Sequence, residues 1–131
     1  MSVEIGLKGR AEETVTDANT AQAACSGALP VYGTPFMTAL MEKAAWTSIA
    51  PHLAPGESTV GTAMNITHTS PTPVGMTVTC HSELVAVEGR KLTFKVTLAD
   101  EKGPVGGGTH ERFIIQNEKF QKKADAKKAA E

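Results

Sequence analysis

The 131-residue chain has no apolar run close to the roughly 18 residues needed to cross a bilayer. Its first ten residues contain no hydrophobic segment of the kind a secretion signal needs, so we expect a cytoplasmic protein. Aromatic residues make up only 5% of the chain, and the formal net charge is −1. Both values argue against a base-stacking or duplex-binding surface, so we expect no nucleic-acid partner. Because no apolar run is long enough to cross a bilayer, we also expect no membrane partner.

Cysteine pairs and metal-binding motifs are also missing. Cys25 and Cys80 form no Cys-x-x-Cys pair, and in a chain without a secretion signal both are expected to be reduced and structural. The four histidines lack a ligand spacing such as His-Glu-x-x-His, so we expect no metal site. The glycine-rich stretch from Gly103 to Thr109 lacks the lysine of a phosphate-binding loop. Close approach of the backbone within or beside a strand explains it better.

The chain does contain enough apolar sequence for one globular domain. Hydrophobic residues make up 40% and charged residues 21%, which is typical of a folded soluble protein. A chain of this length buries roughly two thirds of its extended surface. We therefore expect a single domain over residues 1–120, followed by a Lys- and Ala-rich tail over 121–131 that is a solvated helix or a frayed end.

One segment carries a strong helix pattern. Thr34 is the expected N-cap, Pro35 the expected first helical residue, and Pro51 follows the last one, which predicts a helix from Pro35 to Ala50. Residues at 3.6-residue spacing form its apolar stripe. These are Met37, Leu40, Met41, Ala44 and Ser48.

After Gly56 the pattern alternates, as in half-buried strands. Short turns, including Glu88-Gly89, predict that four long strands form an antiparallel meander. The predicted strands are Ser58–Thr69, Met76–Val87, Arg90–Ala99 and Pro104–Gln116, with a candidate fifth strand at Arg10–Thr16. The first long strand is expected to place Val60, Thr62, Met64, Ile66 and His68 on one face. A curved sheet covered by one helix is the α+β hot-dog arrangement, and its free edges predict a dimer.

Four residues are candidates for chemistry, each with a structural alternative. Glu42 borders the apolar stripe and is either an ordinary boundary carboxylate or a base whose pKa rises in a partly dry cleft. His68 ends an apolar strand face and is either a packed rim histidine or a site residue. Thr34 is first a helix cap, although a hydroxyl there can also polarise a carbonyl. Arg112, on the same strand face as His110, is either a surface ion-pair member or a substrate anchor.

Several short segments, taken together and in order, resemble the bacterial fluoroacetyl-CoA thioesterase family of hot-dog proteins. The resemblance runs in one register from about Val31 to Phe120. The segments that carry it are Val31–Glu42 (VYGTPFMTALME), Gly56-Glu57, Gly61-Thr62, Thr67–Thr69 (THT), Val87–Arg90 (VEGR) and Gly108–Arg112 (GTHER).

This resemblance implies a dimeric hot-dog fold that hydrolyses an acyl-CoA thioester, with coenzyme A as part of the substrate and no separate cofactor. It implies catalytic roles for Thr34, Glu42 and His68, and substrate contacts for Gly61 and Arg112. The thioester carbonyl is then expected at the N-terminal end of the helix, near Gly61, where amide donors stabilise an oxyanion.

The stretch from Ala21 to Pro30 departs from the family pattern. The family's fluoroacetyl-specific member carries a phenylalanine-bearing lid there, whereas this stretch is shorter, rich in small residues and free of phenylalanine. That difference favours a broader range of short acyl chains. Two other functions stay open from the sequence: a hot-dog hydratase or dehydratase that uses Glu42 and His68, and a non-catalytic acyl-CoA-binding dimer.

Overall fold

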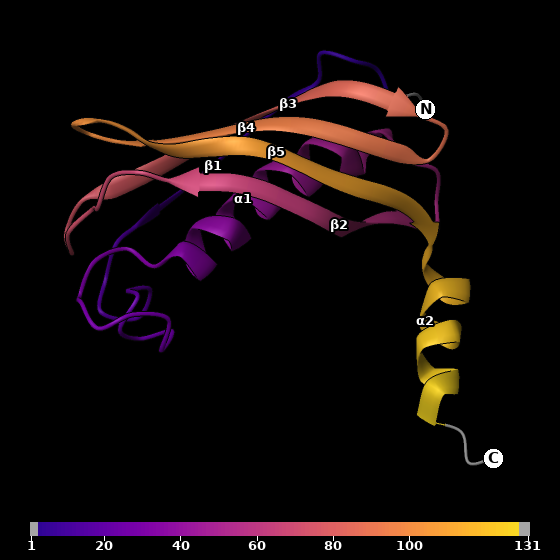
Figure 1. The fold of residues 1–131 in the computed structure, drawn as a ribbon. Coiled ribbons are helices and arrows are strands. Elements are labelled where there is room, and N and C mark those ends of the chain that lie inside the picture. Colours follow the sequence, from indigo (N-terminus) through magenta and orange to yellow (C-terminus); the bar gives the residue numbers. More distant parts are fainter. Residues whose placement is uncertain (1–2, 129–131) are drawn as a thin grey trace.

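The computed structural model describes residues 3–128 and consists of one curled antiparallel sheet that wraps around a long helix (Figure 1). The strands are β1 (Lys8–Thr14), β2 (Glu57–His68), β3 (Thr77–Glu88), β4 (Lys91–Asp100) and β5 (Gly103–Gln116). The helices are α1 (Thr34–Ile49), the short 3-10 turn η1 (Ala50–His52), α2 (Asn117–Asp125) and the terminal turn η2 (Ala126–Lys128). This is the predicted α+β arrangement.

The strand order corrects the predicted meander. The order across the sheet is β1-β3-β4-β5-β2, so β2 pairs with β5 and not with β3, the next strand along the chain. Only β3, β4 and β5 form a meander. The connection between β2 and β3, residues 69–76, is longer than a tight hairpin loop and crosses to the other side of β5 and β4. An alternating pattern marks a strand but does not identify its neighbours.

A β-bulge in β2 overturns the predicted face of that strand. The register with β5 shifts between Gly61 and Ala63, so Thr62 has no paired partner on β5. Because side chains alternate along a strand, this extra residue moves Val60 to the outer face, while Met64, Ile66 and His68 keep the inner one. The bulge thereby turns Gly61 inward, toward the helix.

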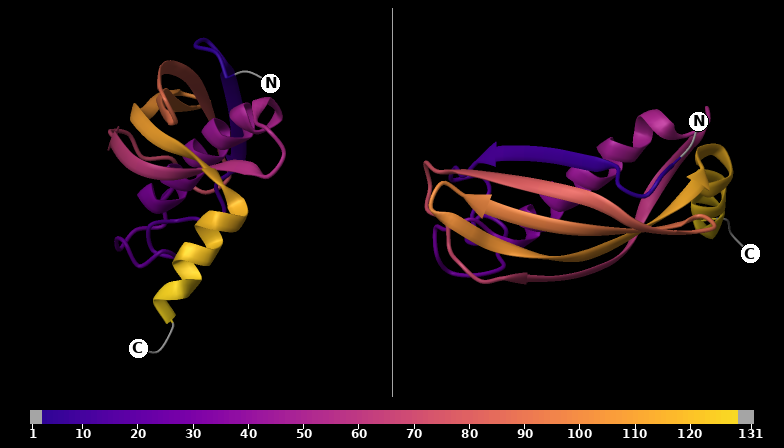
Figure 2. Two further views of the ribbon diagram at one scale, coloured as in Figure 1. Left: turned by 90° about the vertical axis from the view of Figure 1, so that its right-hand side faces the viewer. Right: turned by 90° about the horizontal axis from the view of Figure 1, so that it is seen from above.

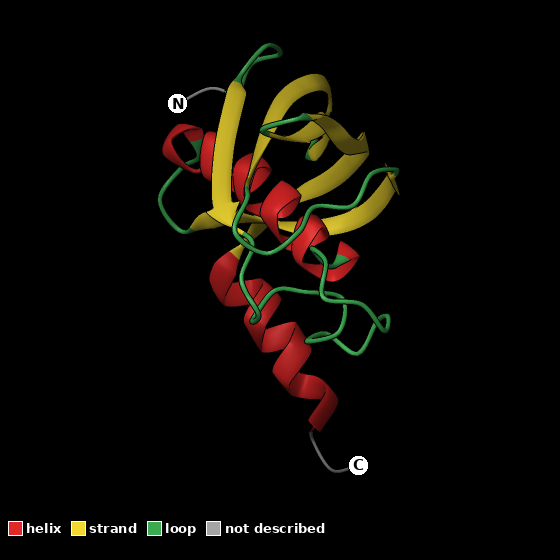
Figure 3. Ribbon diagram, turned by 90° about the vertical axis from the view of Figure 1, so that its left-hand side faces the viewer, coloured by secondary structure: helices red, strands yellow, loops and turns green. Residues whose placement is uncertain are grey.

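Helix α1 lies along the concave face of the sheet and fills the core (Figures 2 and 3). Its N-cap is Gly33 rather than Thr34, which is the first helical residue and makes no side-chain capping hydrogen bond. The helix thus begins one residue earlier than predicted. It accepts Pro35 at the next position because the N–H groups of the first helical turn have no partner within the helix. The helix buries Met37, Leu40, Met41, Ala44, Ala45 and Ile49 against the inner face of the sheet, where β4 contributes Leu92, Phe94, Val96 and Leu98.

Helix α2 projects from the end of β5, away from the sheet (Figure 2). All of its residues are exposed, which agrees with a solvated helix. The helix runs through the expected boundary between residues 120 and 121, and residues 129–131 of the expected tail lie outside the described residues. Within residues 3–128, no helix is both long and apolar enough to span a membrane.

The two cysteines differ in their environment. Both are free; Cys80 lies in the core, where burial raises the pKa of its thiol to about 12. Cys25 is exposed and has a positive φ of 56°. The expected structural role therefore fits Cys80 and not Cys25.

Close packing of β1 on α1 depends on Gly9. A Cβ atom at this position would lie 2.2 Å from the carbonyl oxygen of Ala44 and 2.8 Å from Cβ of Ser48. Ala44 is buried and Ser48 half-buried on the side of α1 that faces β1, so the strand could accept a side chain only by moving away from the helix.

We expect Gly9→Ala to lower the free energy of unfolding by about 2 kcal/mol, because the new methyl group overpacks the contact between strand and helix. Urea denaturation measures this change. The control is Lys8→Ala on the same strand, where the exposed side chain predicts a change within about 0.5 kcal/mol. Equal midpoints for the two variants would contradict the close packing.

Candidate active site

One group of predicted residues lies at the start of α1. The hydroxyl of Thr34 and Nδ1 of His68 are hydrogen-bonded at 2.7 Å, which joins the helix to the end of β2. Both side chains line a cavity of about 310 Å³, whose wall includes Ala21 and Ser26 of the segment that precedes the helix. Burial lowers the pKa of His68, and a backbone hydrogen bond with Ser70 acts in the opposite direction. A neutral imidazole therefore faces a threonine hydroxyl.

The ring of Tyr32 packs against the ring of His68. The two rings meet edge to face, with centroids 6.4 Å apart. The Tyr32 side chain is buried and its hydroxyl donates a hydrogen bond to Glu13 on β1 at 2.5 Å, while burial and Glu13 both raise its pKa. The sequence analysis missed both residues. The one signal available was that Tyr32 is the only tyrosine of the chain and sits two residues before Thr34.

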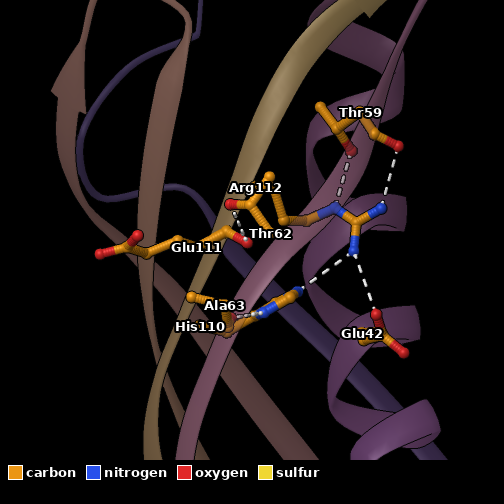
Figure 4. Close-up of polar contacts among 7 residues, drawn as sticks. All are labelled: Glu42, Thr59, Thr62, Ala63, His110, Glu111 and Arg112. Carbon is orange, nitrogen blue, oxygen red and sulfur yellow. Dashed lines mark hydrogen bonds and ion pairs between the residues drawn. The ribbon is translucent and has the colours of Figure 1, made fainter.

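The second group centres on Arg112, whose side chain is buried between β5 and β2 and points at α1 (Figure 4). Its Nε donates to the hydroxyl of Thr59 at 2.8 Å, and Nη2 donates to the Thr59 carbonyl oxygen at 2.9 Å. Nη1 lies 3.1 Å from Nε2 of His110 and 3.9 Å from a carboxylate oxygen of Glu42. Arg112 is 6% exposed, so the alternative of a surface ion-pair member is wrong.

His110 completes the surroundings of this guanidinium. Its Nδ1 lies 2.8 Å from the carbonyl oxygen of Ala63, which can only accept, so Nδ1 carries the proton. Its Nε2 is then a free acceptor for the Arg112 N–H. Burial is the main cause that lowers the pKa of His110, and the charge of Arg112 acts in the same direction. The sequence placed both residues on one strand face but gave no sign of this contact.

Glu42 and Gly61 face each other beside Arg112. The Glu42 side chain is 43% exposed, so within one chain the partly dry cleft is not formed around it. A Cβ atom on Gly61 would lie 2.8 Å from a carboxylate oxygen of Glu42, so glycine leaves the space that the carboxylate occupies. Gly61 therefore adjoins Glu42 in the middle of α1, and the expectation that it lies near the N-terminal end of the helix is wrong.

The five predicted residues thus fall into two groups. One contains Thr34 and His68, and the other contains Glu42, Gly61 and Arg112. Glu42 lies eight positions after Thr34 along α1, a rise of about 12 Å. The groups offer different chemistry: a hydroxyl with a neutral imidazole, and a half-exposed carboxylate held by a guanidinium. In residues 3–128 there is no cluster of three or more His, Cys, Asp or Glu side chains that could hold a metal ion.

Comparison with solved structures identifies the class of protein. A Thermus thermophilus protein described as a thioesterase superfamily member superimposes with a TM-score of 0.90 at 26% sequence identity. The match covers 97% of this chain and 94% of that one. The helix wrapped by a curled sheet is accordingly the hot-dog fold of thioesterases, as predicted.

Closer relatives narrow the class to a family. The family model for fluoroacetyl-CoA-specific thioesterases matches residues 15–118. A fluoroacetyl-CoA thioesterase of Streptantibioticus cattleyicolor is 48% identical over 100 residues, which are 76% of this chain and 72% of that protein. A point variant of a fluoroacetyl-CoA-specific thioesterase, solved with fluoroacetate and CoA, has a TM-score of 0.84 and 40% identity, and the match covers 90% of this chain and 99% of that one. This chain belongs to the fluoroacetyl-CoA-specific thioesterase family, and the predicted thioester hydrolase is confirmed.

The buried neutral His110 predicts a loss of stability in acid. Its pKa is lower in the folded protein than its ordinary value of 6.5, so the unfolded chain binds more protons between pH 7 and pH 5. The free energy of unfolding should therefore fall as the pH falls through this window. His110→Gln should reduce that fall, and His68, whose pKa is also lowered, accounts for part of the remainder.

Urea denaturation at pH 7 and pH 5 measures the effect. His81→Gln, which replaces an exposed histidine on β3, is the control and should keep the wild-type difference between the two pH values. The same difference in His110→Gln as in the wild type would contradict the assignment of a neutral His110.

Proposed function

We propose that this protein is a cytoplasmic homodimeric enzyme that hydrolyses the thioester of a small acyl-CoA to the free acid and CoA. Glu42, Thr34 and His68 are the proposed catalytic residues, and Gly61 and Arg112 the proposed substrate contacts. The observation that carries the proposal is a half-exposed carboxylate that lies 3.9 Å from a buried guanidinium, beside a glycine that leaves room for that carboxylate. Complexes of the related thioesterase with CoA support the substrate class.

Glu42 acts on the thioester carbonyl by one of two routes. Either it takes a proton from a water molecule that attacks the carbonyl carbon, or its own oxygen attacks and forms an anhydride that water then cleaves. Each route breaks the C–S bond and releases the CoA thiolate, a good leaving group because the parent thiol has a pKa of about 8.5. Arg112 orients the carboxylate, and amide donors near Gly61 stabilise the oxyanion.

Thr34 and His68 act on the other side of the same bond. In the tautomer with the proton on Nε2, the Thr34 hydroxyl donates to Nδ1 of His68, and the ring can give its Nε2 proton to the departing sulfur or orient the attacking water. The threonine hydroxyl, fixed by this bond, polarises the carbonyl or holds the carboxylate. Both roles need Thr34 and His68 close to a Glu42 carboxylate.

A second protomer supplies this proximity. β2 is an edge strand of 12 residues whose outer side has no neighbour in one chain. Pairing of two copies of β2 about a two-fold axis runs antiparallel and sets the His68 end of one strand beside the Glu57 end of the other. The Thr34 and His68 pair of one protomer then approaches the half of its partner that carries Gly61, Arg112 and Glu42.

We therefore expect a dimer in solution. Sedimentation equilibrium over a concentration series should give about twice the 13.7 kDa mass of the chain. A single-chain mass at micromolar concentration, with turnover intact, would contradict a site assembled from two protomers.

Glu42→Gln should lower kcat for acyl-CoA hydrolysis by at least about 100-fold, because the amide can neither take a proton nor attack the carbonyl. The matched control is Glu111→Gln on β5, whose carboxylate points away from α1 toward Lys91 and should leave kcat unchanged (Figure 4). Thiol release from acetyl-CoA measures turnover, and circular dichroism checks the fold. Near-normal turnover in Glu42→Gln would refute the proposed role.

The acyl group follows from the segment that lines the Thr34 and His68 cavity. Ala21 and Ser26 present small side chains there. We infer that the enzyme accepts several short acyl groups and does not select a fluorinated one. A panel from acetyl-CoA to medium-chain and aryl acyl-CoAs, with fluoroacetyl-CoA included, measures this range. Thermal stabilisation by these ligands without thiol release would instead favour a binding protein, and turnover of hydroxyacyl-CoA without free thiol would favour a hydratase or dehydratase.

A further inference from the structure

A basic groove lies between α2, the end of β5 and the turn that joins β3 to β4. Its volume is about 310 Å³, at the small end of the range for ligand sites. Three side chains in the lining are cations, and no carboxylate lines it. The residues of this basic groove are Arg90, Phe113, Ile114, Ile115, Gln116, Lys119, Phe120 and Lys123.

The cations of the basic groove converge from two parts of the chain. Lys119 and Lys123 stand one helical turn apart on the same face of α2, and Arg90 comes from the hairpin turn, whose carbonyl oxygen accepts from the Ile114 N–H at 2.9 Å. None of the three takes part in an ion pair within residues 3–128. They are therefore available to an anionic ligand.

The groove also exposes aromatic surface. Phe113 is 41% and Phe120 44% exposed, although both are large apolar side chains. Two rings beside three free cations match a ligand that combines a flat apolar ring system with phosphates. A neighbouring hollow, which shares Gln116 and Lys119 with the groove, differs because Glu57 and Glu118 also line it. Of these two hollows, the aromatic one is lined by cations without a carboxylate.

We propose that the basic groove binds the nucleotide end of the acyl-CoA substrate, with its phosphates on Arg90, Lys119 and Lys123 and its adenine against Phe113 and Phe120. The inference rests on the proposed function for its substrate, because phosphorylated adenosine is the part of CoA farthest from the thioester. It assigns α2 a binding role, whereas the sequence favoured a solvated helix or a frayed end.

The groove lies close to Arg112 along β5 but opens on the other face of the sheet. Phe113 directly follows Arg112, so its side chain is on the outer face, whereas Arg112 points at α1. The strand covers about 10 Å from Arg112 to Ile115, close to its end. The extended pantetheine arm of CoA spans such a distance between its thiol and its phosphates. The proposal therefore requires one acyl-CoA molecule to place its thioester at Glu42 and to pass its arm along β5 and around the end of the sheet, so that its nucleotide occupies the groove.

The test compares two substrates that share the thioester but not the nucleotide: acetyl-CoA and S-acetyl-pantetheine. The double variant Lys119→Gln/Lys123→Gln should raise KM for acetyl-CoA about tenfold and leave kcat unchanged, because two phosphate contacts are lost. KM for S-acetyl-pantetheine should stay at the wild-type value. The matched control, Lys122→Gln/Lys128→Gln, removes the same charge from residues of α2 and η2 that do not line the groove.

A direct binding measurement separates this proposal from the proposed function. Calorimetric titration with adenosine 3′,5′-bisphosphate should show binding to the wild type and to the control, and about tenfold weaker binding to Lys119→Gln/Lys123→Gln. This pattern supports the groove even in a protein that hydrolyses no thioester. The proposal is overturned if the wild type does not bind the bisphosphate, if both double variants bind it equally, or if the KM values for the two substrates rise together.

Discussion

The arrangement of β2, β5 and α1 depends on one guanidinium group that is almost removed from water. Arg112 is 6% exposed, and a cation in that position destabilises the fold unless its N–H groups find partners and its charge a counterion. Burial lowers its pKa, and the carboxylate of Glu42 acts in the opposite direction. The partners come from three elements: Thr59 on β2, His110 on β5 and Glu42 on α1. One side chain thus connects the edge strand, its neighbour and the central helix.

The local features of β2 follow from this requirement. The bulge at Thr62 turns Gly61 and Thr59 inward on one side of it and Met64 on the other, so that the strand supplies both a polar partner and an apolar surface. Without a side chain, Gly61 leaves the Glu42 carboxylate room to approach Arg112. The same arrangement that satisfies a buried charge leaves a carboxylate oriented beside an open edge, which is the proposed site of hydrolysis.

The sequence predicted the fold class, the long helix and every long strand to within a residue or two, because alternation and capping are local patterns. The predicted four-stranded meander was wrong because β2 pairs with β5, a strand far from it in the chain. The predicted inner face of β2 was wrong because a one-residue bulge has no recognisable pattern in the local sequence. Of the site, the resemblance supplied five residues. His110 and Tyr32 were missed, since their roles arise from contacts with Arg112 and His68 that only the tertiary structure creates.

The strand order also has a consequence for folding. β3, β4 and β5 pair through two-residue turns, so their contacts close short loops, whereas the 34 residues 69–102 separate β2 from its partner β5. We expect the hairpins to form early and β2 to join late. In the single chain, before two copies of β2 pair, this edge strand would also open before the central strand β4, and its amide protons would exchange before those of β4. Catalytic competence would be the last property gained as the chain folds and the first lost as it begins to unfold.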